Sequence, residues 1–206
     1  MQQFSEKDID SLDKIYRLNL INSITGYKSA NLIATQSKTG NTNVAIFSSI
    51  THLGSDPALL SFVLRPTTVP RHTYSNLKDT GIFTVNHISS DIISDAHHSS
   101  AKYPESVSEF DMTGLEVEFK YNYPCPFVKN APVQIACEYQ NEYPIKENGT
   151  VLIVAQMKTI YLQDKLLQKD GWVCLEKGNV VSINGLDGYA LPKLLERFDY
   201  ARPKKI

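Results

Sequence analysis

Apolar and polar residues alternate with a period of two in several short segments of this chain. The clearest is 58–65, where Ala58, Leu60, Phe62 and Leu64 share one face of a predicted strand. The same reasoning predicts further strands at 31–35, 43–50, 82–88, 115–121, 133–143, 151–162 and 180–183. Many short strands with few helices indicate an antiparallel barrel or sandwich with peripheral helices, and not a doubly wound sheet.

Three segments have helical spacing instead: 5–16, 73–79 and 192–198. The first follows candidate caps at Ser5 or Asp8 and is interpreted as a short surface or interface element. The second is expected to end at Gly81, and the third to form one last helical turn. The polar stretch 89–110 is long enough to be functional or partly helical.

The two longest predicted strands flank the dipeptide Asn148-Gly149. Asn-Gly readily adopts the two positive-φ positions of a type I′ turn. The sequence therefore predicts a hairpin with a two-residue turn at this point.

Composition limits the function classes. The chain has 206 residues with 42% hydrophobic and 21% charged residues, which fits one globular domain. Its net charge of -1 lacks the basic excess of a nucleic-acid-binding surface. No apolar run approaches the ~20 residues that span a bilayer, and the first residues do not resemble a signal peptide. We therefore expect a cytoplasmic protein that binds neither nucleic acid nor membrane.

Cysteines and histidines give weak signals for metal or disulfide chemistry. Cys125, Cys137 and Cys174 fit neither a CxxC motif nor a zinc ribbon, and we interpret them as small hydrophobic residues of a reduced protein. The adjacent His97 and His98 are interpreted as a solvated loop pair rather than metal ligands. The phosphate-loop, GxGxxG and GxSxG motifs are also missing from the sequence.

Polar residues gather at the ends of successive predicted strands: Thr42-Asn43, Ser48-Ser49, Arg65, Arg71-His72-Thr73 and Asn86-His87. In an antiparallel meander such ends return to one rim. Two arginines and a hydroxyl at a helix start would suit a phosphate group there. The alternative is that Thr73 is only an N-cap, Arg65 a solubilising residue and Ser48-Ser49 an ordinary strand pair. The residue types alone leave both interpretations open.

Several stretches resemble one family in their order and spacing: NVAIFSS (43–49), GSDPALLSFVLRP (54–66), RHTYSNL (71–77) and TGIFTVN (80–86). Two later pairs are similar to the same family: SAKYP (100–104) with SEF (108–110), and GLDGY (185–189) with YARP (200–203). The chain thus resembles the flavin reductase-like proteins of the FMN-binding split barrel, close to the flavoredoxin branch, from about Asn22 to Pro203.

The resemblance implies a mainly β fold, a six-stranded antiparallel Greek-key split β-barrel with peripheral helices. It implies one flavin reductase-like domain over 1–206, in which 1–21 is an N-terminal extension and 186–206 a tail packing on the barrel or on a dimer partner. It further implies a homodimer with FMN bound at the barrel rim near the dimer interface.

The resemblance also assigns residues to the flavin. The strand 43–49 would meet the isoalloxazine ring, Arg65 with 71–73 would hold the phosphate, and Asn86, His87 and Lys102 would lie near the same pocket. The cofactor-binding residues expected in this way are Thr42, Asn43, Val44, Ala45, Ser48, Ser49, Arg65, Arg71, His72, Thr73, Asn86, His87 and Lys102.

Hydride transfer to a flavin needs no protein nucleophile, because the cofactor carries the chemistry. Backbone N–H groups at 43–45 and the hydroxyls of Ser48 and Ser49 are suited to bind flavin N5 and O4. Lys102, or an arginine of the partner chain, would stabilise charge near N1 and O2. No catalytic acid or base is assigned.

We therefore expect an NAD(P)H-dependent flavin reductase, with NADH, NADPH or a redox partner protein as electron donor. One alternative is a flavoredoxin-like electron carrier that does not use a nicotinamide directly. The other is a split barrel that binds haem or another flat ligand, with His72 or His87 as axial ligand.

Overall fold

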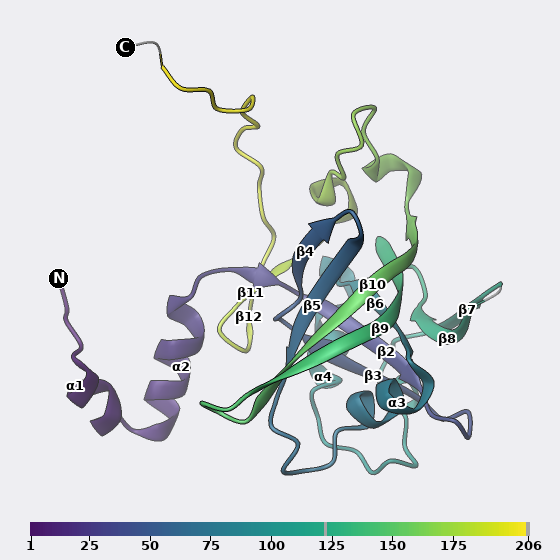
Figure 1. The fold of residues 1–206 in the computed structure, drawn as a ribbon, viewed down its shortest axis with the longest axis horizontal. Helices are drawn as coiled ribbons and strands as arrows, with labels where there is room; N and C mark the ends of the chain where they lie inside the picture. The colour runs from purple at the N-terminus through teal and green to yellow at the C-terminus, as the bar shows by residue number, and fades with distance from the viewer. Residues whose placement is uncertain (122, 205–206) are drawn as a thin grey trace.

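The computed structural model describes residues 1–121 and 123–204, and its centre is one antiparallel sheet that curls into a barrel (Figure 1). The strands follow the order β3-β2-β6-β9-β10-β5-β4. Their bounds are β2 (Asn31–Gln36), β3 (Thr42–Phe47), β4 (Thr51–Ser55), β5 (Ala58–Leu64), β6 (Ile82–His87), β9 (Val133–Ile145) and β10 (Thr150–Leu162).

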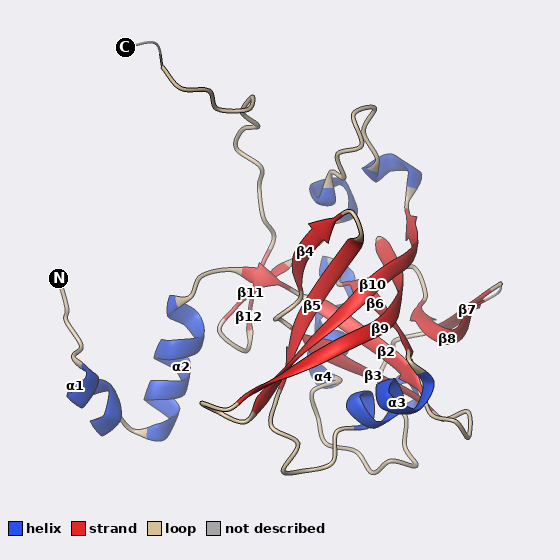
Figure 2. Ribbon diagram, in the orientation of Figure 1, coloured by secondary structure: helices blue, strands red, loops and turns tan. Residues whose placement is uncertain are grey.

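Two smaller sheets and several short helices surround this barrel (Figure 2). The small sheets comprise β1 (Lys28–Ser29), β11 (Ser182–Asn184) and β12 (Gly188–Ala190), and the pair β7 (Val117–Lys120) with β8 (Tyr123–Val128). The α-helices are α1 (Glu6–Ser11), α2 (Lys14–Ile24), α3 (His72–Thr80), α4 (Ile93–His98) and α5 (Glu109–Met112). Short 3-10 helices lie at Ser90–Ile92, Asp164–Leu166 and Leu175–Gly178.

The sheet buries side chains on both of its faces. Along β2, Ile33 packs in one apolar cluster while Leu32 and Ala34 pack in the other, as the alternation of a strand requires. In the first cluster the Phe62 ring lies 5.3 Å from Phe47 and meets it edge to face. This packing fixes β2 and β3, which carry much of the predicted site.

A serine side chain closes the barrel between the end of the edge strand β3 and the end of β5. Ser49 Oγ donates to the Val63 carbonyl at 3.1 Å and accepts from the Val63 N–H at 3.0 Å. These are the two backbone groups that a neighbouring strand would otherwise satisfy, and β4 pairs with β5 only over 58–61. Ser49 therefore joins the segment after β3 to the end of β5.

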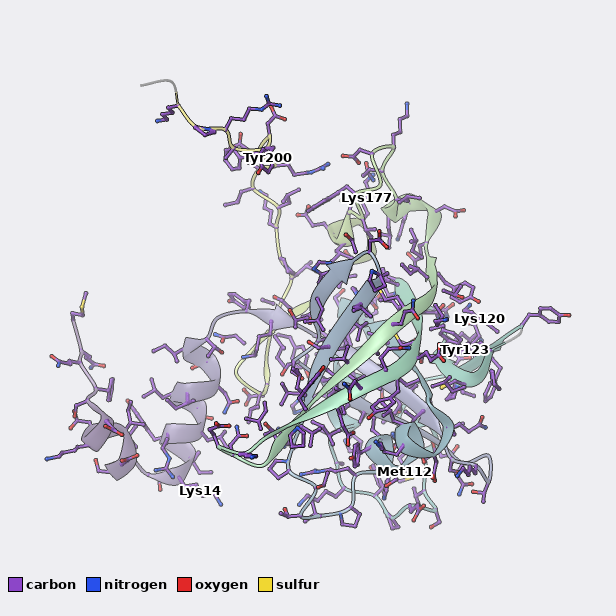
Figure 3. The ribbon with its side chains drawn as sticks, viewed as in Figure 1. Lys14, Met112, Lys120, Tyr123, Lys177 and Tyr200 are labelled. Carbon is purple, nitrogen blue, oxygen red and sulfur yellow. The ribbon has the colours of Figure 1, made fainter. Side chains whose placement is uncertain are left out.

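The N-terminal helices and the C-terminal tail extend away from the barrel. Within the described ranges, α1 and α2 contain no buried residue, and Figure 3 shows Lys14 on α2 and Tyr200 on the tail far from the sheet. The tail contacts the segment before β11, because Arg197 pairs with Asp170 at 2.8 Å. No helix in the described part of the chain has the length and apolar character needed to cross a bilayer.

The predicted mainly β split barrel with peripheral helices is confirmed, with some differences in its elements. The sheet has seven strands instead of six, because β4 forms an additional hairpin with β5. The predicted helix at 5–16 is two helices, α1 and α2, each with its own N-cap: Ser5 caps α1 and Asp13 caps α2.

Two local predictions were wrong. The tail at 192–198 has no helical turn, and its Leu194 N–H instead donates to Glu176 Oε1 at 2.7 Å. The hairpin between β9 and β10 has a four-residue loop, closed by the Gly149 N–H on the Ile145 carbonyl at 2.9 Å. Only Gly149 has a positive φ there, of 71°, so a type I′ turn is excluded.

Candidate functional site

Helix α3 begins without a side-chain cap. Its N-cap residue is Arg71, and no side chain in the described ranges accepts a hydrogen bond from the first turn. Three N–H groups, those of His72, Thr73 and Tyr74, lack an intrahelical acceptor at such an end. With the positive end of the helix dipole, they form an anion-binding arrangement.

Arg71 adds a fixed positive charge beside this helix end. Its Nε donates to the Pro66 carbonyl at 3.4 Å, which ties the two ends of the loop between β5 and α3 together. Arg65 begins the same loop and is exposed to solvent. The loop therefore places the Arg71 guanidinium next to the uncapped helix, with Arg65 exposed at the other end of the same loop.

Thr73 is not the N-cap that the alternative interpretation proposed. It is buried in the first turn of α3, and its hydroxyl accepts from Asn43 Nδ2 at 3.1 Å. Asn76 Nδ2 donates to Thr35 Oγ1 at 3.0 Å in the same network. These bonds hold α3 against the ends of β2 and β3, so the helix start has a fixed position relative to the strand.

The free edge of β3 meets a buried carboxylate. The Val44 N–H donates to Glu109 Oε2 at 3.1 Å, and Thr42 Oγ1 lies 2.9 Å from Ser108 Oγ. Burial raises the pKa of Glu109, while its backbone hydrogen bonds and the charge of His72 oppose that rise. The contacts place the end of the segment that carries Lys102 directly on β3.

The sequence analysis did not identify Glu109 as a site residue. It lies within the SEF stretch, next to the Ser108 side chain that caps α5. The only local signal was this serine followed by an acidic residue, because the bond from Val44 spans 65 positions of sequence.

Backbone donors along β3 divide between its two edges. Successive N–H groups of a strand point to opposite sides, so the bond from Val44 to Glu109 identifies the residues that face away from β2. Asn43 and Ala45 then face β2, and Ile46 shares the free edge with Val44. The donor suited to a ligand is the Ile46 N–H rather than the groups at 43–45.

Asn86 and His87 lie at the other end of the barrel from α3. In β2, Thr35 pairs with Asn43 while Asn31 pairs with His87, so about 13 Å of strand separates the two positions. The side chain of Asn86 is fully buried and accepts from the Val128 N–H at 3.0 Å, which fastens β8 to the barrel. Its Nδ2 donates to Thr84 Oγ1 at 2.9 Å.

The structure thus brings together one subset of the predicted site residues: Thr42, Asn43, Val44, His72 and Thr73, with Arg71 beside them. Ala45 lies in the middle of β3, and Ser48 follows that strand half-buried. Lys102 is exposed. Ser49, which closes the barrel, and Asn86 make hydrogen bonds within the protein.

The adjacent histidines have tyrosine partners. His97 Nδ1 lies 3.1 Å from the Tyr189 hydroxyl, and His98 Nε2 lies 2.7 Å from the Tyr103 hydroxyl. They form the end of α4 rather than a loop. The three cysteines are free thiols, and the described ranges contain no group of three or more His, Cys, Asp or Glu residues placed to hold a metal ion.

Comparison with known proteins identifies one family for this chain. Residues 26–174 match the model of the flavin reductase like domain family. The crystal structure of a split barrel domain protein from Shewanella frigidimarina NCIMB 400, which is assigned as a flavin reductase, is 38% identical to this chain. It has a TM-score of 0.94 and covers 98% of this chain and 100% of that one.

Two less similar structures share the fold. Nitrilotriacetate monooxygenase component B from Bacillus cereus is 20% identical, with a TM-score of 0.82 over 97% of this chain and 98% of that chain. Flavoredoxin of Desulfovibrio vulgaris (Miyazaki F) is 17% identical, with a TM-score of 0.73 over 85% of this chain and 92% of that chain.

Proposed function

Because the chain belongs to the flavin reductase-like family, we propose that it is an oxidoreductase that binds FMN at the start of α3 and along the free edge of β3. The observation that carries this proposal is the uncapped first turn of α3 beside Arg71. A phosphate supplies the acceptor oxygens that this turn lacks. A terminal phosphate also favours FMN over FAD, in which the corresponding phosphate is linked to a nucleotide.

The chain's own residues would bind and orient the cofactor. Arg71 and the N–H groups of the first α3 turn hold the phosphate, while the Asn43–Thr73 bond keeps that turn fixed against β3. The Ile46 N–H offers a donor to the ring further along the strand. Lys102 lies in the segment held on β3 by Ser108 and supplies positive charge near the ring.

Bound FMN would supply the capacity to accept a hydride or electrons. The protein would exclude water from the ring and position it, as expected where the cofactor performs the reaction. The proposed activity is NAD(P)H-dependent flavin reduction, and the likeness in fold to flavoredoxin makes electron transfer without a nicotinamide the competing activity.

The proposed assembly is a homodimer held by the N-terminal helices and the C-terminal tail. Large apolar side chains of α2 are exposed, among them Ile15, Ile21 and Ile24, the last at 72%. An isolated helix of 11 residues is marginal in water. The extended placement of these segments is supported by the Shewanella structure, which matches 98% of this chain with a TM-score of 0.94. A second copy is the partner that would bury these side chains.

The test is the visible spectrum of the purified protein, loaded with FMN and mixed with NADH or NADPH without oxygen. We expect saturable FMN binding and loss of the flavin absorption band with at least one nicotinamide. If FMN binds but neither nicotinamide reduces its absorption band, the reductase activity is excluded and the electron-carrier activity takes its place. A Soret band, or failure to bind FMN, would overturn the proposal altogether.

A further inference from the structure

The N-terminal helices and the C-terminal tail (191–204) leave the barrel from one small sheet, in opposite directions. β1 follows α2 and β12 precedes the tail, and both strands pair antiparallel with β11. β1 and β12 therefore run parallel to each other, so the chain enters this sheet at one end and leaves it at the other (Figure 1). Within the described ranges, no hydrogen bond or ion pair joins 1–24 to 191–204.

Contacts with the segment 170–176 hold the first part of the tail in an extended conformation. The Arg197 guanidinium pairs with Asp170 at 2.8 Å and lies over the Trp172 ring, 4.4 Å from its centroid. Large apolar side chains of the tail nevertheless remain uncovered: Leu195 is 90%, Phe198 84% and Tyr200 91% exposed. Burying such a side chain is worth about 1.5–3 kcal/mol, so a surface that covers the tail would stabilise it.

An acidic surface lies on α1. Residues 5–13 contain four acidic residues and one basic residue. Asp8 and Asp13 have a local role, because they complete the N-caps of α1 and α2. Glu6 and Asp10 are exposed, and no hydrogen bond reaches either carboxylate in the part of the chain that the structure describes. The N-terminal helices therefore combine an acidic α1 with the exposed apolar side chains of α2.

The end of the tail has the opposite charge. Residues 200–205 contain three basic residues and no acidic one, and the acidic Glu196 and Asp199 precede this basic end. Arg202 and Lys204 are exposed, and neither forms an ion pair within the described ranges. The tail thus offers apolar and basic side chains, which complement those of the N-terminal helices.

We propose that the C-terminal tail of one copy docks on α1 and α2 of a second copy. Arg202 and Lys204 would lie against the acidic α1, and the apolar side chains of the tail against α2. The proposal rests on the homodimer proposed above and identifies the segments that meet in it. Charge complementarity selects this pairing over tail on tail or helix on helix, in which like charges would face each other.

The geometry of the small sheet favours a second copy over the same chain, because the two segments of one chain diverge from it. A two-fold axis then makes the same contact twice, once in each direction, as an isologous interface requires. Each copy would bury its own tail and its own helices against its partner.

The test reverses the charge of each surface in turn. The helix variant is Glu6→Lys with Asp10→Lys, and the tail variant is Arg202→Glu with Lys204→Glu. All four residues are exposed and the helix caps stay intact, so both variants should fold. Each variant alone brings like charges together. Its dimer dissociation constant, measured by analytical ultracentrifugation, should therefore rise at least about tenfold.

Mixing the two variants separates docking on a second copy from docking on the same chain. In a mixed dimer, the basic helices of one chain meet the acidic tail of the other, and the acidic helices meet the basic tail, so both contacts are restored. By native mass spectrometry, we expect the heterodimer to make up about nine-tenths of an equimolar mixture, against about half for random pairing. If the tail docked on its own chain, each variant would keep its mismatch and the mixture would pair at random.

The control carries the same net charges at other positions. One chain has Asp79→Lys with Glu116→Lys, and the other has Lys38→Glu with Lys129→Glu, so that each changes one member of two exposed ion pairs. Both chains should dimerise like the parent protein. They should also pair at random at about 0.15 M salt, where charges more than about 8 Å apart are largely screened.

Three results would overturn the proposal. Random pairing of the helix and tail variants, with a dimeric parent protein, would reject this docking and leave the homodimer in place. An equal excess of heterodimer in the control mixture would show that net charge, and not the tail, drives pairing. A monomeric parent protein would reject the homodimer and this docking together. None of these measurements uses FMN or a nicotinamide, so the proposed flavin chemistry is tested separately.

Discussion

The carboxylate of Glu109 accepts a hydrogen bond from the Val44 N–H at 3.1 Å, between residues 65 positions apart in sequence. Val44 lies on the edge strand β3, where an unpaired N–H would otherwise face the candidate flavin site. The bond anchors α5, and with it the preceding segment that carries Lys102. The bond therefore connects the backbone of β3 to the segment that carries Lys102.

Replacing Glu109 with leucine should lower the free energy of unfolding by about 1–3 kcal/mol, because the Val44 N–H then loses its acceptor. Glu109→Gln should retain most of the stability, since its amide oxygen can accept the same bond. Denaturant unfolding of the flavin-free variants measures both effects. Equal stability of Glu109→Leu and the parent protein would show that the bond contributes nothing.

The phosphate assignment predicts a loss of affinity without a loss of stability. Arg71→Ala removes a charge-assisted contact worth roughly 1.5–3 kcal/mol, so FMN affinity should fall about tenfold or more. The melting temperature of the flavin-free protein should change little, because Arg71 is partly exposed and its hydrogen bond to the Pro66 carbonyl is long, at 3.4 Å.

Arg17→Ala is the matched control for the charge, since Arg17 lies on α2 away from the barrel. Titration of each variant with FMN, followed by flavin fluorescence, gives the two dissociation constants. Equal affinities in Arg71→Ala and Arg17→Ala would move the phosphate to another part of the rim, with Arg65 and Lys102 as the next candidates.

The register of β2 explains why the predicted site residues do not all lie together. Sequence reasoning expected the ends of several strands to meet at one rim. The strands do alternate in direction, but Asn43 pairs near the Thr35 end of β2, and His87 pairs with Asn31 at the other end. Strand ends that follow one another in the sequence therefore lie at opposite ends of the barrel.

Periodicity predicted the elements that bury one face and missed those that do not. In β5, Leu60, Phe62 and Leu64 are buried as the alternation required. Strand β4 is largely exposed at the barrel edge and has no apolar alternation, so nothing in its sequence revealed it. The role of Glu109 depends on a tertiary contact, which a local pattern does not encode.

The exposed face of α2 predicts the assembly. Ile21→Glu should shift the protein from dimer to monomer, because a charge cannot be buried without a partner at an apolar interface. Multi-angle light scattering at micromolar concentration measures the mass directly, against 23.1 kDa for one chain. Since Ile21 is 44% exposed in the single chain, the variant should still fold.

The control is Asn19→Glu, a charge placed at an exposed polar position of the same helix. It should leave the dimer intact. A parent protein that runs as a monomer would contradict the proposed homodimer, and a dimer that persists in Ile21→Glu would show that α2 does not form the interface.

His87, at the half-buried end of β6, predicts how stability changes in acid. Its folded pKa is about 4, against an ordinary value of 6.5, so between these values the unfolded chain binds a proton that the folded chain does not. Stability from this group is complete above pH 6.5 and is lost progressively as the pH falls toward 4. By pH 5 the loss is about 2 kcal/mol.

The measurement is the free energy of unfolding at pH 7.5 and at pH 5 for the parent protein, His87→Gln and His52→Gln. Carboxylates contribute to acid unfolding in all three proteins. The difference between the proteins in the loss of unfolding free energy therefore gives the contribution of His87. His87→Gln should lose about 2 kcal/mol less than the parent over this range. His52→Gln, at an exposed position of β4, should behave like the parent. If His87→Gln shows the same loss as the parent, the ring is solvated and already protonates near its ordinary pKa.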